Sequence, residues 1–132
     1  MPLLPATDHH ARIDTKEGAV KYEGTWHITE MEMWDEDYLN MEVQAYICIR
    51  RDGSGDFQFG LVSGQIDGEV IKTADGDRFE FTWDGNDECD EASGSGRLEM
   101  ESRNKLEGKI KIHHGDSSTL AAERAPKSKT RD

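Results

Sequence analysis

Two aromatic rings flank three carboxylates in the segment Trp34-Asp-Glu-Asp-Tyr38, and these residue types together suit recognition of a cation. Negative charge steers a basic peptide or an amine toward such a surface, and an aromatic face then holds it by a cation–π contact. We therefore identify Trp34, Asp35, Asp37 and Tyr38 as candidate binding residues. The two rings would serve equally as plugs that close the end of a fold, and the sequence leaves both interpretations open.

A second acidic segment, Asp84-Gly-Asn-Asp-Glu-Cys-Asp-Glu-Ala-Ser-Gly94, is the most unusual stretch of the chain. Its oxygen side chains at alternate positions faintly resemble a calcium-binding loop, although the central Gly and the distant Glu of an EF-hand are missing. We expect a solvated loop whose Asp and Asn side chains cap its own backbone amides. A divalent cation such as calcium is the alternative, and no other cofactor is predicted. The candidate binding residues in this loop are Asp84, Asn86, Asp87 and Glu88.

His113 is the remaining candidate, at the end of a strand pattern and directly before His114. Neighbouring residues of a strand point to opposite faces, so the two rings do not readily share one metal. We expect an exposed pair of histidines next to a turn. As the alternative, one of the two would join Asp84 or Asp90 in a mixed metal site. A metal-assisted enzyme that uses the Asp84–Glu91 loop is therefore the catalytic alternative. The sequence contains no phosphate loop, zinc motif or nucleophile elbow, which favours a non-enzymatic role.

Predicted strands, in which every second residue is apolar, lie between these segments and determine where the segments are in the fold. In Met41-Glu-Val-Gln-Ala-Tyr-Ile-Cys-Ile49 every second residue is apolar, which is typical of a strand with one wet face in an antiparallel sheet. No window shows a helical stripe. The pattern predicts an all-β fold, a single antiparallel up-and-down barrel of about eight strands. The predicted strands are 24–33, 41–50, 55–62, 66–73, 78–83, 95–101, 105–112 and 118–124. If Gly64 and Gly68 instead kink one long strand, seven remain.

Strand alternation also sorts the connections between the two ends of such a barrel. Short turns near residues 52, 75 and 103 fall at one end, two of them carrying Asp-Gly hairpin signals. The other end receives the connections Trp34–Asn40, 62–65, Asp84–Gly94 and His113–Ser117. Longer loops over one end of a rigid barrel are a common place for binding residues. The candidate residues therefore gather at one acidic end.

Large side chains dominate the inward positions of the pattern, so we expect a mostly packed interior. The expected inward residues are Trp26, Ile28, Val43, Ile47, Phe57, Phe59, Phe79, Phe81, Trp83, Met100, Ile110, Ile112 and Leu120, with small Ala45 and Ala122. A β-bulge near Thr29 would return Glu30 to water. Without the bulge, Glu30 would be a buried carboxylate and a functional candidate.

The first strand opens with Gly24-Thr-Trp26, and the last strand carries Arg124. This pair resembles the calycin pattern of lipocalins and avidins. The resemblance implies a barrel that is closed at one end by the guanidinium of Arg124 stacked on the indole of Trp26. Phe79-Glu-Phe-Thr-Trp-Asp-Gly-Asn-Asp-Glu88 and Gly115-Asp-Ser-Ser118 resemble a group of small bacterial proteins of uncharacterised activity, which implies a bacterial origin.

The chain has 132 residues and a net charge of −12, which fits one domain with a strongly acidic surface. We predict a mobile arm at 1–19, a barrel domain at 20–125 and a basic disordered tail at 126–132. Such a surface repels phosphate backbones, so we expect no nucleic-acid partner. No apolar run is long enough to span a membrane, and we expect a cytoplasmic protein that is a monomer or a weak dimer.

These features favour a small binding module that engages a ligand or a basic protein or peptide at its acidic end. The alternatives are the metal-assisted enzyme and an acidic inhibitor or immunity-type protein that neutralises a basic partner. Cys89 lies among acids that disfavour its thiolate, and Cys48 faces outward, so neither is expected to be reactive.

Overall fold

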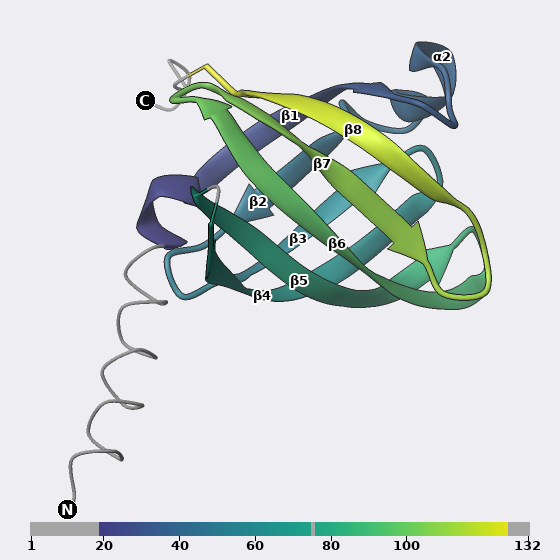
Figure 1. The fold of residues 1–132 in the computed structure, drawn as a ribbon. Coiled ribbons are helices and arrows are strands. Elements are labelled where there is room, and N and C mark those ends of the chain that lie inside the picture. The colour runs from purple at the N-terminus through teal and green to yellow at the C-terminus, as the bar shows by residue number, and fades with distance from the viewer. Residues whose placement is uncertain (1–18, 75, 127–132) are drawn as a thin grey trace, which may run out of the picture.

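The structure is a computed structural model that describes residues 19–74 and 76–126. Within these residues eight antiparallel strands close into one barrel, because β8 pairs with β1 (Figure 1). The strands are β1 (Gly24–Met31), β2 (Tyr46–Ile49), β3 (Ser54–Phe59), β4 (Val62–Thr73), β5 (Gly76–Asp87), β6 (Asp90–Ser102), β7 (Lys105–Ile112) and β8 (Ser117–Arg124). A 3-10 helix, η1 (Ala19–Tyr22), precedes β1, and the short helix α2 (Glu36–Leu39) lies between β1 and β2. The predicted up-and-down barrel of eight strands is confirmed.

The predicted barrel domain, residues 20–125, contains all eight of these strands. The predicted arm at 1–19 and the predicted tail at 126–132 lie outside the described residues except for Ala19 and Pro126. No helix in the described part of the chain is long and apolar enough to cross a membrane.

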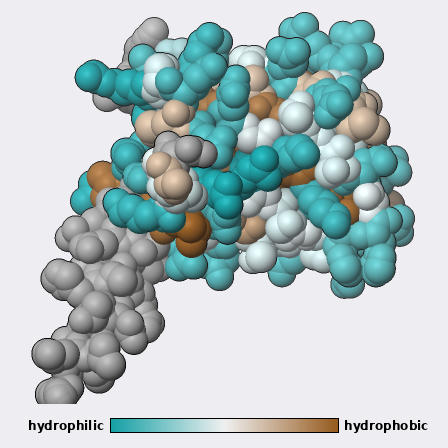
Figure 2. Space-filling view, viewed as in Figure 1, coloured by the Kyte–Doolittle hydropathy of each residue, from teal (hydrophilic) through white to brown (hydrophobic). Residues whose placement is uncertain are grey.

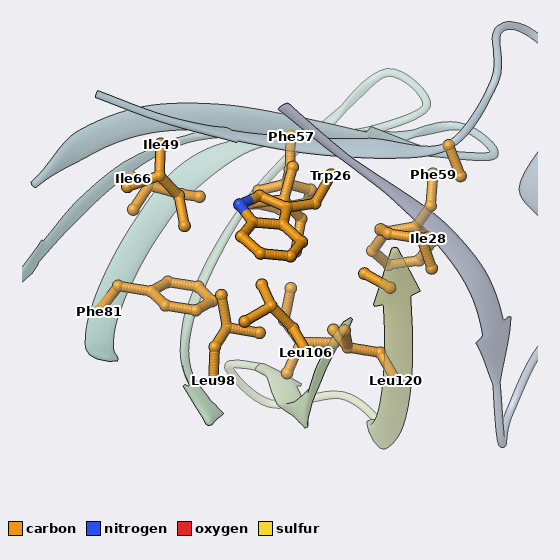
Figure 3. Packing of buried hydrophobic residues seen from close by; sticks show 14 of the residues in the cluster. Trp26, Ile28, Ile49, Phe57, Phe59, Ile66, Phe81, Leu98, Leu106 and Leu120 are labelled. Carbon is orange, nitrogen blue, oxygen red and sulfur yellow. The ribbon is translucent and has the colours of Figure 1, made fainter. Parts of the chain in front are cut away.

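Apolar side chains from every strand fill the barrel interior, as expected from alternation along each strand (Figure 3). The side chains that Figure 3 labels come from all sides and converge on one core. One buried residue from each strand in turn is Trp26, Ile47, Phe57, Ile66, Phe79, Leu98, Leu106 and Leu120. The structure agrees with the expected packed interior.

Glycines at inward positions of β4 and β6 make room for the largest rings. A Cβ atom on Gly64 would lie 2.7 Å from Cε3 of Trp83, and one on Gly68 would lie 2.5 Å from Cζ of Phe79. Native Cβ atoms do not approach other carbons so closely, so any larger residue would displace a ring. Tight packing of aromatic rings over bare backbone therefore explains these glycines.

The turn between β3 and β4 lies at Gly60 and Leu61, so the predicted turn at 62–65 is wrong. Gly60 takes a left-handed conformation with φ of 60°, which glycine adopts at little cost. Gly64, which reads as a turn residue in the sequence, is an interior position of the long strand β4. The error moves the turn by a few residues and leaves the strand number unchanged.

The predicted long loop Asp84–Gly94 is also wrong, because β5 and β6 run through it as a hairpin. Asp87 is directly opposite Asp90, and only Glu88 and Cys89 form the turn. Glu88 adopts a positive φ of 61° there. The inward positions of this hairpin include Gly85 and Gly94, where a Cβ atom would meet the backbone of the neighbouring strand. These glycines are typical of a turn, but here they are strand residues, because the close approach of the neighbouring strand leaves no room for a side chain.

Strand β2 is shorter than the predicted strand 41–50, and Val43 is not in the interior. The side chain of Val43 is 45% exposed and that of Met41 is 53% exposed. Met100 and Ile112, also expected inside, are only partly buried and pack against the core. Pairing of β2 with β1 begins only at Tyr46, so Met41 and Val43 lie in the loop between α2 and β2.

The predicted β-bulge in the first strand is confirmed. The register between β1 and β8 shifts between Ile28 and Glu30, which leaves Thr29 as the extra residue. Glu30 is exposed and Met31 is buried, so the bulge returns the apolar pattern to the interior. Glu30 is therefore not a buried functional carboxylate.

One end of the barrel is closed by Trp26 and Arg124. The guanidinium carbon of Arg124 lies 4.1 Å from the centre of the indole ring, and Nη1 donates to the carbonyl of Glu23 at 2.9 Å. Nη2 donates to the carbonyl of Arg103 at 3.1 Å, and Nε1 of Trp26 donates to the carbonyl of Tyr22 at 2.9 Å. This is the contact that the Gly-x-Trp start and the late Arg lead one to expect.

Candidate docking surface at one end of the barrel

The two ends of the barrel differ in the connections that they carry. The closed end, with η1 and Trp26, carries the turns after β2, β4 and β6 (left in Figure 1). The opposite end carries α2 and the turns after β3, β5 and β7. The predicted sorting of connections between the ends is therefore correct, although two of the turns lie at different residues.

The second end, which we call the acidic end, comprises residues 32–45, 60–63, 84–93 and 113–117. These segments contain eleven Asp and Glu residues and no Lys or Arg. The carboxylates are Glu32, Asp35, Glu36, Asp37, Glu42, Asp84, Asp87, Glu88, Asp90, Glu91 and Asp116. The closed end has charges of both signs, with cations in excess: it carries Lys21, Arg50, Arg51, Lys72, Arg103, Lys105 and Arg124 beside Glu23, Asp52, Asp77 and Glu123. The barrel is thus electrically polarised along its length.

Hydrogen bonds hold the connection 32–45 in place. Asp35 caps α2, since its Oδ1 accepts from the backbone N–H of Tyr38 at 3.1 Å. Oδ1 of Asn40 accepts from the N–H of Ala45 at 2.8 Å and closes the loop that follows α2. Leu39 is buried, and its carbonyl accepts from the N–H of Gly60 at 2.9 Å. The connection is therefore anchored to the β3–β4 turn.

Trp34 and Tyr38 act as plugs at this end. The ring of Trp34 lies 5.0 Å from that of Phe59 and stacks on that of Tyr38 at 6.1 Å, measured between ring centres. The hydroxyl of Tyr38 accepts from the N–H of Leu61 at 3.2 Å. Both residues are half-buried against the core. Of the two interpretations of these rings, the geometry favours the plug.

Three large apolar side chains are exposed beside the plug. Met33, Met41 and Val43 are 47%, 53% and 45% exposed, and Val20 is the one other exposed large apolar residue among those that the structure describes. The sequence does not reveal this group, because Met41 and Val43 fit the alternating pattern of a strand with a buried face. Methionine packs adaptably against varied partners, so these side chains suit a docking surface.

The candidate residues of β5 and β6 do not converge on one point. Asp84 and Asn86 are exposed on the outer face of β5, whereas Asp87 is on the inward face of the strand, as Trp83 is. Glu88 lies in the turn, where its N–H donates to the carbonyl of Leu61 at 3.0 Å. Across residues 19–74 and 76–126 no group of three or more His, Cys, Asp or Glu is arranged to hold a metal ion. The geometry thus gives the calcium site and the metal-assisted enzyme no support.

His113 is exposed just after β7, and its ring centre lies 3.9 Å from that of His114. The expectation that the two rings point to opposite faces is therefore wrong, because His114 is in the turn with a φ of 65°. The N–H of His113 donates to the carbonyl of Ser93 at 2.7 Å, which fixes the backbone rather than the imidazole. Cys48 is half-buried, Cys89 is exposed, and both are free thiols.

Comparison of the chain with family models, with curated proteins and with solved structures finds no match.

Proposed function

We propose that the protein is a binding protein whose acidic end docks a basic protein or peptide that also presents apolar side chains. The observation that carries the proposal is the coincidence, at one end, of eleven carboxylates without Lys or Arg and the exposed group Met33, Met41 and Val43. Protein interfaces commonly join an apolar centre to a polar rim. The charge would speed and orient the encounter, and burial of the apolar group would supply affinity.

A ligand inside the barrel is disfavoured. The core is continuous from Tyr22 at the closed end to Leu39 under the acidic end. The plug residues Trp34 and Tyr38 cover that core, so a partner meets the outside of the plug. This supports a macromolecular partner over an enclosed small molecule.

The inhibitor or immunity-type alternative uses the same surface and differs only in the partner, a basic enzyme that docking would inactivate. We place the protein in the cytoplasm as a monomer in the absence of its partner. The free thiols of Cys48 and Cys89 are consistent with a reducing compartment.

A labelled amphipathic peptide with Lys on one helical face and Leu on the other tests the apolar group. We expect Met41→Ser combined with Val43→Ser to weaken binding by about tenfold or more, since two apolar contacts are lost. The matched control is Val20→Ser, which removes the exposed apolar side chain outside the acidic end. Fluorescence anisotropy measures both, and equal affinities of the two variants would contradict the proposal.

Charge is tested separately with the same peptide at low and high salt. Glu36→Gln with Asp37→Asn should slow association and weaken its dependence on salt, because long-range attraction at this end is reduced. Glu99→Gln with Glu123→Gln removes the same net charge from the outer wall. If the wall variant slowed association as much, net charge alone would explain binding and the acidic end would not be the docking surface.

A further inference from the structure

A hollow lies on the outer wall of the barrel, across β4 to β8 and away from the plug at the acidic end. It has a volume of about 740 Å³, within the range of small-molecule sites, and we call it the outer hollow. It is lined by Asp67, Gly68, Glu69, Arg78, Glu80, Phe81, Thr82, Ser95, Gly96, Arg97, Lys109, Ile110, Lys111 and Ser117. Figure 2, viewed as in Figure 1, looks onto the wall formed by β5 to β8, where strongly hydrophilic residues run between paler ones.

Three cations meet in this hollow. Arg97 of β6 is directly opposite Lys109 of β7, and Lys111 follows on the same face of β7. Like charges directly opposite one another destabilise an antiparallel pair. This arrangement is therefore unfavourable in the free protein, and it occurs in a chain whose net charge is −12.

A β-bulge creates this pairing. The register of β6 and β7 shifts between Met100 and Ser102, so that Glu101 is the extra residue. Continued from the pair of Ser102 and Lys105 without the bulge, the register would place Arg97 opposite Ile110, an inward residue. The bulge keeps the inward residues of β6 and β7 opposite one another, and it thereby also pairs outward Arg97 with outward Lys109.

Glu80 of β5 is directly opposite Arg97, yet no carboxylate of the described residues forms an ion pair with any of the three cations. None of Arg97, Lys109 and Lys111 is in an ion pair, whereas Nε of Arg78 in the same hollow lies 2.6 Å from Oε2 of Glu80. Carboxylates are abundant on this protein surface and could form ion pairs with these cations. That neighbouring cations have no ion pair therefore indicates that they bind an anionic ligand.

Hydroxyl groups surround the cations. Ser95 of β6 is directly opposite Lys111, and Ser117 of β8 flanks Lys111 on its other side. Thr119 is directly opposite Lys109, and Thr82 of β5 is opposite Ser95. Serine and threonine donate hydrogen bonds to oxyanions, so charge and donors occur together.

Acidic residues bound the cationic patch on both sides. Asp67 and Glu69 line the hollow from β4, and Glu99 pairs with Glu107 in the next outward row beyond Arg97 and Lys109. An extended polyanion would meet these carboxylates, whereas a compact anion fits between them.

We propose that the outer hollow binds the phosphate group of a small phosphate monoester, with Arg97, Lys109 and Lys111 holding the dianion and the hydroxyls completing its hydrogen bonds. The volume of the hollow exceeds that of phosphate alone and leaves room for the esterified part of the ligand. The outer hollow shares only Ser117 with the acidic end, and the proposal does not depend on docking there.

Ribose 5-phosphate is the probe, measured by calorimetry and by its effect on the melting temperature. We expect a saturable rise in melting temperature with ribose 5-phosphate, none with ribose, and weaker binding of inorganic phosphate. Lys109→Gln should weaken binding by about tenfold or more, and without ligand it should melt no lower than the native chain, because repulsion with Arg97 is relieved. Arg97→Gln should behave alike.

Lys105→Gln is the matched control, on the same face of the same strand and outside the hollow. It should bind ribose 5-phosphate as the native chain does. Absence of saturable binding to the native chain, or equal loss in Lys105→Gln and Lys109→Gln, would overturn the proposal. Tighter binding of short single-stranded DNA would identify a polyanion surface instead. A dimer that Lys109→Gln dissociates would identify a second copy as the occupant.

Discussion

Arg124 joins the last strand of the barrel to the first through contacts that no other residue type reproduces. Its guanidinium lies over Trp26 and donates to carbonyls of the segment before β1 and of the β6–β7 turn. Lysine offers a single charged group without the planar face or the fork of donors. The contact therefore depends on the shape of arginine as well as on its charge.

Replacement of Arg124 by Lys should lower the free energy of unfolding by about 2 kcal/mol, from lost stacking and lost charge-assisted hydrogen bonds. Urea denaturation followed by tryptophan fluorescence measures the loss. Arg103→Lys is the control, because only the backbone carbonyl of Arg103 takes part in the contact. A native-like midpoint for Arg124→Lys would show that the closure does not stabilise the barrel.

Two tyrosines make the fold sensitive to alkaline pH. Burial, assisted by the charge of Asp77, raises the pKa of Tyr22 from 10.0 to about 12. Burial together with the hydrogen bond to Asp56, 2.7 Å from hydroxyl to carboxylate oxygen, raises the pKa of Tyr46 from 10.0 to about 12. The folded state therefore holds protons that the unfolded chain releases.

A folded-state pKa above the unfolded value means stability that is complete below pH 10 and is lost as the pH rises to about 12. We expect the urea midpoint to fall across this window. Tyr46→Phe should reduce the slope, since one of the two groups no longer titrates. An unchanged slope would show that these hydroxyls ionise alike in the folded and unfolded chains.

Strand β4 owes its close packing to glycines rather than to side chains. Gly64→Ala should destabilise the barrel by about 1–3 kcal/mol, because its Cβ would lie 2.7 Å from Cε3 of Trp83 and 3.0 Å from the carbonyl oxygen of Asp84. Ser63→Ala, the outward neighbour on the same strand, should change little. Thermal melts compare the two, and similar melting temperatures would show that Trp83 relaxes without cost.

Alternation together with turn signals predicted the barrel and the end to which each connection belongs, with a count of eight strands that left seven as the alternative. The bulge at Thr29 could also be predicted, because the apolar pattern changes phase there. Glycine misled prediction elsewhere: Gly64 and Gly85 read as turn signals, yet they are inward strand residues beside another backbone or a ring. The sequence shows where a glycine is, but it does not show whether a turn or a neighbouring ring or backbone requires the glycine there.

The two candidate surfaces differ in how far the sequence reveals them. The carboxylates of the acidic end could be grouped from strand direction alone. Met41 and Val43 could not, since their alternation matches a buried strand and their exposure follows from the late start of β2. The cations of the outer hollow could not be brought together either, because a bulge at Glu101 sets the pairing of Arg97 with Lys109.

The charged features of the molecule lie at different places along the barrel. The closed end is basic and held by Arg124, the opposite end is acidic and plugged by Trp34, and the wall between them carries the outer hollow. Because the core occupies the interior, all three features are on the outside of the barrel. The proposed partner and the proposed small anion would therefore occupy different parts of the surface.

The pairing of β1 with β8 has a consequence for biosynthesis. Because β1 is synthesised before β8, one edge of β1 stays uncovered until β8 has left the ribosome. Until residues 117–124 emerge, the nascent chain presents two unpaired edges, those of β1 and β7, to every other polypeptide nearby. A chain that lacked β8 would thus keep both of these edges uncovered and would be prone to aggregate.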